Sequence, residues 1–263
     1  MICETRARQR GLPELISGDR CQDSAMTALP ASPALLRFPT GSLPVYEVKF
    51  LLTEETAQQL ERELRTALQP DPHGLAGRYT TTTLYCDTPA FDIFHRRLRS
   101  KCRLRRYGDL DRVFLERKSK RGDRVRKRRA DVPLADVVRL ETPDADAVWD
   151  GQWFHRRVLQ RQLAPVLAVM YDRTAYFGAG EHGPIRLTFD RAVRGTIASG
   201  WQVAPFTAGE PVLSDTVIGE FKFRGPMPTL FKRVIESHQL LPGSASKYRL
   251  CAAALELAVS PQQ

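Results

Sequence analysis

Apolar and polar residues alternate in short runs along most of the chain from Val45 onward. Because successive residues of a strand point to opposite faces, runs of this kind predict β-strands. Strands are expected over residues 45–52, 79–86, 101–107, 112–120, 124–132, 166–177, 184–190 and 216–223. The sequences Tyr107-Gly108-Asp109 and Arg121-Gly122-Asp123 predict hairpin turns between the third, fourth and fifth of these strands.

Helical spacing of apolar residues is found in fewer segments. Ala57, Leu60, Leu64 and Leu68 recur at the intervals of one helix face, and Thr53 precedes them as an N-cap. Further helices are expected over residues 90–98, 144–163, 229–239 and 246–259. Many strands joined by tight turns, with few helices between them, indicate an antiparallel sheet or barrel with the helices outside it.

Residues 1–43 show neither the alternation of a strand nor the spacing of a helix, and they are rich in Pro, Ser, Ala and Arg. We expect a disordered or loosely attached tail here, followed by a single domain over residues 44–259. No apolar run approaches the roughly 18–20 residues of a membrane span, and the basic N-terminus lacks the apolar segment of a secretory signal. Five scattered cysteines without a CxxC or CxxH pair indicate neither a disulfide framework nor a zinc site, and favour the reducing cytoplasm.

Positive charge is concentrated between Arg96 and Arg129. This stretch holds seventeen Lys or Arg and only four Asp or Glu, whereas the whole chain has a net charge of +10, so the remainder is slightly acidic. Such a local patch predicts a surface that binds a polyanion. Few aromatic residues interleave the basic strands to stack bases, which disfavours RNA. Strand alternation places these side chains on common faces: Lys101, Arg103 and Arg105; Glu116 and Lys118; Lys127 and Arg129.

The chain carries nine short motifs in one order: Tyr46–Phe50, Leu84–Pro89, Lys101–Arg105, Phe114–Lys118, Lys127–Arg129, Tyr171–Tyr176, Ile185–Asp190, Ile218–Phe223 and Ser246–Tyr248. The VTC domain has motifs of this kind in the same order, and the chain resembles that family over residues 44–250. The VTC domain is a polyphosphate polymerase module of the triphosphate tunnel metalloenzyme superfamily, which also contains the CYTH-type enzymes. The resemblance implies a β-dominated α+β fold: a closed antiparallel eight-stranded β-barrel, or triphosphate tunnel, with charged side chains inside and helices packed outside.

The same resemblance implies roles for individual residues of the tunnel. Glu220 is implied to hold a divalent metal, Mn²⁺ or Mg²⁺, and a structural ion pair with Lys222 is the alternative. From its own sequence context, Asp190 is expected to be an ion-pair partner or a turn former, and Asp87 to accept backbone N–H bonds in its Asp-Thr-Pro turn. The implied catalytic residues are Lys49, Arg103, Arg105, Lys118, Arg173, Arg186 and Lys222. The implied substrate-binding residues are Lys101, Lys127, Arg129, Lys247, Glu47 and Glu116, of which the two glutamates are favoured as partners that neutralise the cations.

The implied function is that of a metal-dependent polyphosphate polymerase, which transfers the terminal phosphoryl group of ATP to a growing polyphosphate chain. Catalysis of phosphoryl transfer depends on positioning and positive charge more than on acid–base groups. CYTH-type members carry Glu-x-Glu-x-Lys on the first strand, and Val45 stands at the first of these glutamate positions, which argues against the adenylate cyclase and thiamine triphosphatase branches. The alternatives are a tripolyphosphatase or nucleoside triphosphatase of the same fold, and a non-catalytic polyphosphate-binding module. The expected partners are ATP and polyphosphate, with no specific nucleic acid.

Overall fold

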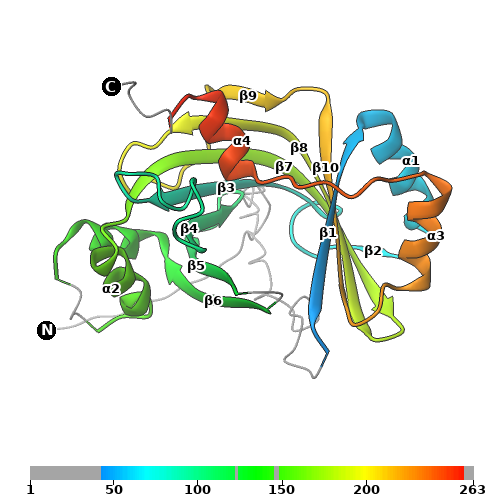
Figure 1. Cartoon of the computed structure of the whole chain (residues 1–263), viewed down its shortest axis with the longest axis horizontal. Helices are drawn as coiled ribbons and strands as arrows, with labels where there is room; N and C mark the ends of the chain where they lie inside the picture. The colour runs from blue at the N-terminus through cyan, green and yellow to red at the C-terminus, as the bar shows by residue number, and fades with distance from the viewer. Residues whose placement is uncertain (1–42, 122–123, 145–147, 258–263) are drawn as a thin grey trace, which may run out of the picture. The chain divides into compact units, whose positions relative to one another are not determined.

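The computed structural model describes residues 43–121, 124–144 and 148–257. The predicted tail, apart from its last residue, and the centre of the predicted Arg121-Gly122-Asp123 turn lie outside these ranges. The elements follow in the order β1 (Val45–Thr53), α1 (Glu54–Leu64), β2 (Gln69–Pro70), β3 (Arg78–Asp87), β4 (Ser100–Tyr107), β5 (Arg112–Arg121), β6 (Arg124–Pro133), the 3₁₀ helix η2 (Leu134–Glu141), α2 (Gln152–Gln160), β7 (Ala164–Gly180), β8 (Gly183–Ile197), β9 (Glu210–Leu213), β10 (Thr216–Arg224), α3 (Thr229–Ser237) and α4 (Lys247–Ala254) (Figure 1).

The eight predicted strands are all present, as are three of the predicted helices, α1, α3 and α4. Thr53 caps α1 as expected, since its side chain accepts a hydrogen bond from the backbone N–H of Thr56. The segment 144–163 holds a shorter helix than predicted, α2, and a 3₁₀ helix that the sequence did not indicate, η2, precedes it. β2 and β9 were also missed, because two and four residues are too few to show a period.

The helix predicted over residues 90–98 is wrong, because this segment consists of successive turns. Phe91 and Arg96 have φ values of 52° and 64°, which interrupt a right-handed helix. The Asp87 carboxylate also accepts hydrogen bonds from the backbone N–H groups of Thr88, Ile93 and Phe94. The expectation that Asp87 binds backbone N–H groups is therefore confirmed, and these bonds fold the segment back on the end of β3.

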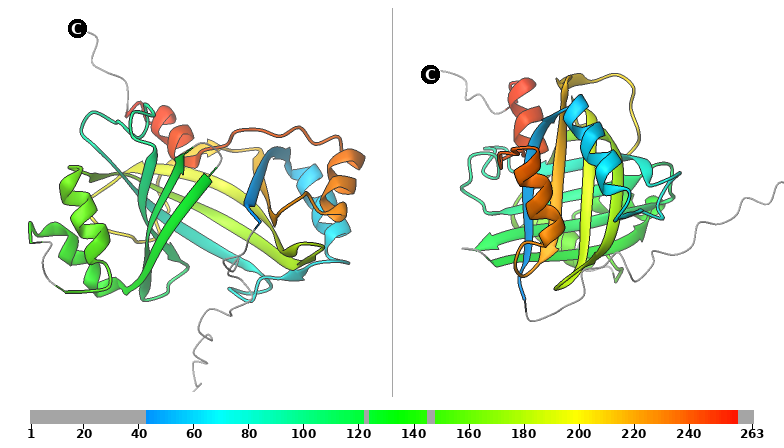
Figure 2. Two further views of the ribbon diagram at one scale, coloured as in Figure 1. Left: turned by 60° about the horizontal axis from the view of Figure 1, so that its bottom comes forward. Right: turned by 90° about the vertical axis from the view of Figure 1, so that its right-hand side faces the viewer.

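The strands form one ten-stranded sheet of β-dominated α+β type. Eight of them follow the order β1-β10-β8-β7-β3-β4-β5-β6, while β2 pairs with β7 and β9 with β8. All these pairings are antiparallel. The closed eight-stranded barrel expected from the resemblance is corrected here: in the described part of the chain no hydrogen bonds join β1 to β6, so the sheet curves without closing (Figure 2).

The free edge of β1 is taken by another segment, which explains the open sheet. After α3 the chain runs back along β1, where Phe50 forms an isolated bridge with Pro242. The backbone N–H of Gly243 donates to the carbonyl of Lys49 at 2.7 Å. These contacts satisfy edge groups of β1 that a closing strand would need.

Apolar residues of β1 and β10 point away from the curved interior and pack under α1 and α3. Phe221 of β10 is fully buried and contacts Phe231 of α3, with ring centroids 4.6 Å apart. Leu60 of α1 belongs to the same core cluster. A second cluster lies under α2 and α4 and includes Leu104 of β4. Because strand residues alternate, this packing turns the charged neighbours of each apolar residue toward the opposite face.

Candidate functional site

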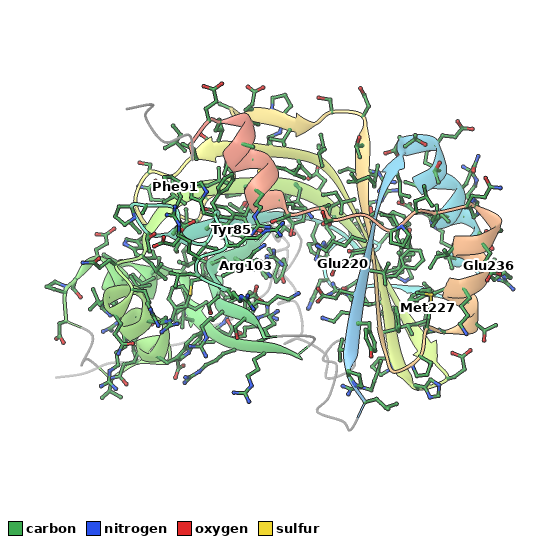
Figure 3. The ribbon with its side chains drawn as sticks, viewed as in Figure 1. Tyr85, Phe91, Arg103, Glu220, Met227 and Glu236 are labelled. Carbon is green, nitrogen blue, oxygen red and sulfur yellow. The ribbon has the colours of Figure 1, made fainter. Side chains whose placement is uncertain are left out.

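The predicted site residues share one face of the curved sheet, which we call the concave face. In the strand register Lys49 is opposite Glu220, Glu47 opposite Lys222, and Arg173 opposite Asp190. The strand register continues through β3 and places the site residues of β4, β5 and β6 on this same face. Figure 3 shows Arg103 of β4 and Glu220 of β10 on facing sides of this sheet, and Glu236 outside it on α3. The concave face carries the cations Lys49, Lys101, Arg103, Arg105, Lys118, Lys127, Arg129, Arg173, Arg186, Lys222 and Lys247.

Side chains bridge the two halves of the curved sheet where the backbone does not. Lys118 of β5 contacts Glu47 of β1 at 2.5 Å, and the same carboxylate lies 3.3 Å from Lys222 of β10. Nearby, the Lys101 ammonium donates to the hydroxyl of Ser246 at 3.0 Å. Glu47 therefore neutralises cations, as the sequence favoured, and also ties together strands that are far apart in the sheet.

Glu116 is the centre of a buried charge cluster on β4, β5 and β6. It is 1% exposed and its carboxylate lies 2.7 Å from Arg103 and 2.5 Å from Lys127. Arg129 approaches it at 3.7 Å. Burial acts to raise the pKa of Glu116, but Arg103 and Arg105 outweigh it and hold the pKa well below the usual range. Glu116 is thus an ionised partner that holds several cations on one surface.

Asp190 plays the same part on β8, as an ion-pair partner. Its carboxylate receives two hydrogen bonds from the Arg173 guanidinium, at 2.6 and 2.8 Å, and a third from Lys247 of α4. Burial acts to raise the pKa of Asp190, and Arg173 and Lys247 lower it below the ordinary value. Arg186, on the same strand, pairs instead with buried Asp71 at 2.7 Å, a partner that the sequence did not indicate.

Arg105 differs from these groups because it is a buried cation without an ion pair. Its side chain is 7% exposed and donates to the hydroxyl of Thr83 at 3.1 Å. Within the described residues no carboxylate oxygen lies at ion-pair distance from its guanidinium. Among the described residues, five carboxylates pair with the eleven cations named above: Glu47, Asp71, Glu116, Asp190 and Glu220. This surplus of positive charge favours the binding of an anion.

Glu220 pairs with Lys49 at 2.9 Å, and Lys222 lies 3.3 Å from Glu47. Burial acts to raise the pKa of Glu220, but Lys49 and Arg173 hold it well below the usual range. No group of three or more His, Cys, Asp or Glu among the described residues could hold a metal ion. A single ionised carboxylate, with Glu47 on the adjacent strand, fits a divalent ion that keeps waters and takes its other ligands from phosphate oxygens.

Several polar residues of the concave face were not among the predicted site residues. The hydroxyl groups of Tyr171, Thr81 and Thr188 are buried and have no hydrogen-bond partner among the described residues. The Lys247 ammonium lies 4.5 Å from the centroid of the Tyr171 ring, so this hydroxyl is close to the cations. The alternation Tyr79-Thr81-Thr83-Tyr85 along β3 was the available signal, because it places four hydroxyl-bearing side chains on one face.

Aromatic rings border one part of the site. The Arg129 guanidinium lies 3.5 Å from the centroid of the Phe114 ring and 5.9 Å from that of Tyr107. Burial acts to raise the pKa of Tyr107, but Arg105 and Arg129 outweigh it and lower the pKa to about 8. Burial lowers the pKa of Lys127 to about 8, against the opposing effect of Glu116.

The sequence of this chain matches one known protein family. The model of a family described as the VTC domain matches residues 45–256. No curated protein matches the chain. The described residues contain no helix that is both long and apolar enough to cross a membrane.

Solved structures of low sequence identity are also similar. A candidate adenylate cyclase from Bacillus halodurans is 14% identical with a TM-score of 0.48, over 76% of this chain and 92% of that chain. The second is HpAC1 from Hippeastrum, a candidate adenylyl cyclase described as having a dominant triphosphatase activity. It is also 14% identical with a TM-score of 0.48, and the match covers 80% of this chain and 95% of that chain. The PH1819 protein from Pyrococcus horikoshii is 13% identical with a TM-score of 0.44, over 80% and 99%.

Proposed function

This chain belongs to the VTC domain family, and from that premise we propose that it is a metal-dependent polyphosphate polymerase. It transfers the terminal phosphoryl group of ATP to the end of an inorganic polyphosphate chain and releases ADP. The observation that carries the proposal is Arg105, which is buried at 7% exposure without an ion pair in the described residues. A chain of phosphates supplies the anionic partner that this guanidinium lacks.

The concave face offers the groups that this transfer requires. Arginine guanidinium groups bind phosphate oxygens through two parallel hydrogen bonds, a role that we assign to Arg105. Arg103 and Arg173 add positive charge while they stay paired with Glu116 and Asp190. The lysines act as point charges along the chain. Glu220 would hold Mg²⁺ or Mn²⁺, which supplies charge opposite the phosphate oxygens when bound. Tyr171 is placed to donate its free hydroxyl to a phosphate oxygen.

The ion pairs favour transfer to phosphate over hydrolysis. Hydrolysis is helped by a group that orients or deprotonates water. Each of the five carboxylates of the concave face in the described residues is already engaged by a cation. The terminal phosphate of a polyphosphate chain is ionised at neutral pH and needs no base to act as the acceptor. The observed pairing therefore suits a phosphate acceptor.

We propose the cytoplasm as the location and residues 44–259 as one domain. ATP is the proposed phosphoryl donor, and Cys86, Cys102 and Cys251 are free and buried among the described residues. Free thiols of this kind are compatible with a reducing compartment.

The direct test incubates the purified full chain with ATP and either Mn²⁺ or Mg²⁺. We expect ADP and phosphate chains longer than three units, detected by gel electrophoresis and ³¹P NMR. Release of free phosphate without chains would instead establish a hydrolase of the same site. Binding of polyphosphate without turnover of ATP would establish a binding module.

Glu220→Gln is the matched test of the metal ligand. This variant removes the negative charge of the carboxylate and keeps its size, so we expect turnover to be lost while tripolyphosphate still binds to the cations. Glu210→Gln, at an exposed position of β9, is the control and should keep the wild-type rate. An unchanged rate in Glu220→Gln would contradict the proposed metal ligand.

A further inference from the structure

A second group of arginines lies on the opposite face of the β5–β6 hairpin. In the register Arg117 is opposite Arg128, and Ser119 is opposite Arg126. These positions alternate with Glu116, Lys118, Lys127 and Arg129, whose side chains occupy the concave face. Because neighbouring strand residues point to opposite sides, Arg117, Arg126 and Arg128 project from the convex side.

Helix α2 adds to this group from the same side. Trp153 and Arg157 are spaced four residues apart, which places them along one stripe of α2, and Arg161 follows at the C-terminal end of the helix. The Arg128 guanidinium lies 4.4 Å from the centroid of the Trp153 ring, so the stripe adjoins β6. Burial, Arg161 and then Arg117 lower the pKa of Arg157, as expected for cations that face one another. We call Arg117, Arg126, Arg128, Arg157 and Arg161 the convex arginine patch.

The patch is uncompensated in the described part of the chain. No carboxylate there lies at ion-pair distance from any of its five guanidinium groups. Other exterior arginines are paired: Arg139 with Asp136 at 3.0 Å and Arg97 with Asp92 at 3.3 Å. Like charges directly opposite on neighbouring strands destabilise a sheet, so the pairing of Arg117 with Arg128 costs stability unless an anion is bound.

The edge strand β6 connects the patch to the concave face. It carries the run Arg126-Lys127-Arg128-Arg129, with two cations on each side. β6 ends the strand order and has no further hydrogen-bonded neighbour among the described strands. Positive charge is therefore continuous from the interior, over the free edge of β6, to the convex side.

We propose that the convex arginine patch binds the outer part of a long polyphosphate chain whose end occupies the concave face, with the chain passing over the edge of β6. This inference rests on the proposed function. A linear chain of phosphates suits the patch because every unit is charged, and because planar guanidinium groups pair with phosphate oxygens in any register. The patch then distinguishes long chains from short ones, which reach only the concave face.

The experiment compares long-chain polyphosphate with tripolyphosphate, using the full chain and a salt titration. Arg117→Gln combined with Arg128→Gln should weaken binding of the long chain about tenfold and reduce the salt dependence by about two released ions. Tripolyphosphate binding should stay at the wild-type value. The control combines Arg97→Gln with Arg139→Gln, which removes the same charge from paired exterior sites and should leave both affinities unchanged.

The outcomes separate this inference from the proposed function. Equal long-chain affinity in the test and control variants would overturn the role of the patch, even if tripolyphosphate binds. Equal loss of both ligands in the test variant would show a general effect on the protein and would also overturn it. If the variant loses binding only to vesicles of anionic lipid, the partner is a membrane and the inference is wrong. A wild-type protein that binds neither phosphate ligand refutes the proposed function itself.

Discussion

The charged residues of the concave face stabilise the protein only in combination. Asp190 is buried against Arg173 and Lys247, and Glu116 is buried against Arg103 and Lys127. A buried ion loses its hydration, so each carboxylate makes the burial of its cations tolerable. Removing one carboxylate leaves cations without compensation in a surface that already has a surplus.

Asp190→Asn should therefore destabilise the protein strongly, by about 3–5 kcal/mol, because Arg173 and Lys247 lose their buried partner. The measurement is urea unfolding at neutral pH in a buffer without phosphate. Asp136→Asn, which removes an exposed partner of Arg139, should cost at most about 1 kcal/mol. Equal stability of the two variants would show that the Asp190 cluster contributes little.

The contribution of Asp190 to the stability of the protein depends on pH in a defined direction. The folded-state pKa of Asp190 lies below its ordinary value, mainly through Arg173 against the effect of burial. Its contribution is therefore present above the unfolded-state pKa of about 4 and is lost as the pH falls toward the folded-state value. The wild-type protein should lose more stability than Asp190→Asn as the pH is lowered below about 4.

At the scale of elements, the spacing of apolar residues predicted most of the strands and helices. The parts of the fold that it did not predict depend on contacts between distant segments. Alternation within each strand separated charged from apolar residues, and the family resemblance implied that Lys49, Arg103 and Glu220 share one face. The turns at Phe91 and Arg96 could not, because they depend on Asp87 and on positive φ values. The cover over the edge of β1 could not be predicted either, because it comes from a segment that returns from α3.

The candidate site was predictable in part for the same reason. Alternation identifies which residues point inward, but not which of them meet. Glu116 joins three cations only because β4, β5 and β6 pair in a particular register. The ion pair of Lys118 with Glu47 requires the curvature of the whole sheet, which no local pattern records.

Helix α4 is the element that carries Lys247 to the concave face. It packs against β8 at Gly195, where an added Cβ would lie 2.8 Å from the Cβ of Cys251. The hydroxyl of Tyr248 also donates to Asp87, which joins α4 to the end of β3. The position of Lys247 therefore depends on close contact between helix and sheet.

Gly195→Ala should displace α4 and cost about 1–3 kcal/mol of unfolding free energy, because the new methyl group overpacks this contact. We also expect weaker tripolyphosphate binding, since Lys247 moves with the helix. Gly243→Ala is the control, because nothing lies within 4 Å of its added Cβ. The measurements are denaturant unfolding and calorimetric titration. Matching values for the two variants would argue against tight packing at Gly195.

At the scale of the whole molecule, the distribution of charge makes stability depend on the ligand. The concave face holds more cations than carboxylates, so its groups repel one another when no anion is present. An anion that binds only the folded protein stabilises it by mass action. The empty protein should therefore be the least stable form.

Tripolyphosphate should raise the melting temperature by several degrees, since a ligand at 100 times its Kd contributes about 2.7 kcal/mol. The effect should shrink as salt screens the charges. Thermal unfolding with and without ligand is the measurement, and sulfate at equal ionic strength is the control. A shift of equal size with sulfate would mean that the gain is general screening.

The free edge of β6 has a consequence for association between molecules. An unpaired strand exposes backbone groups that can pair with a strand of another copy, and natural sheets guard such edges with charge. The consecutive cations Arg126–Arg129 provide that protection by mutual repulsion. Neutralising them removes it, so this strand is where edge-to-edge aggregation should begin when the protein is held at low net charge.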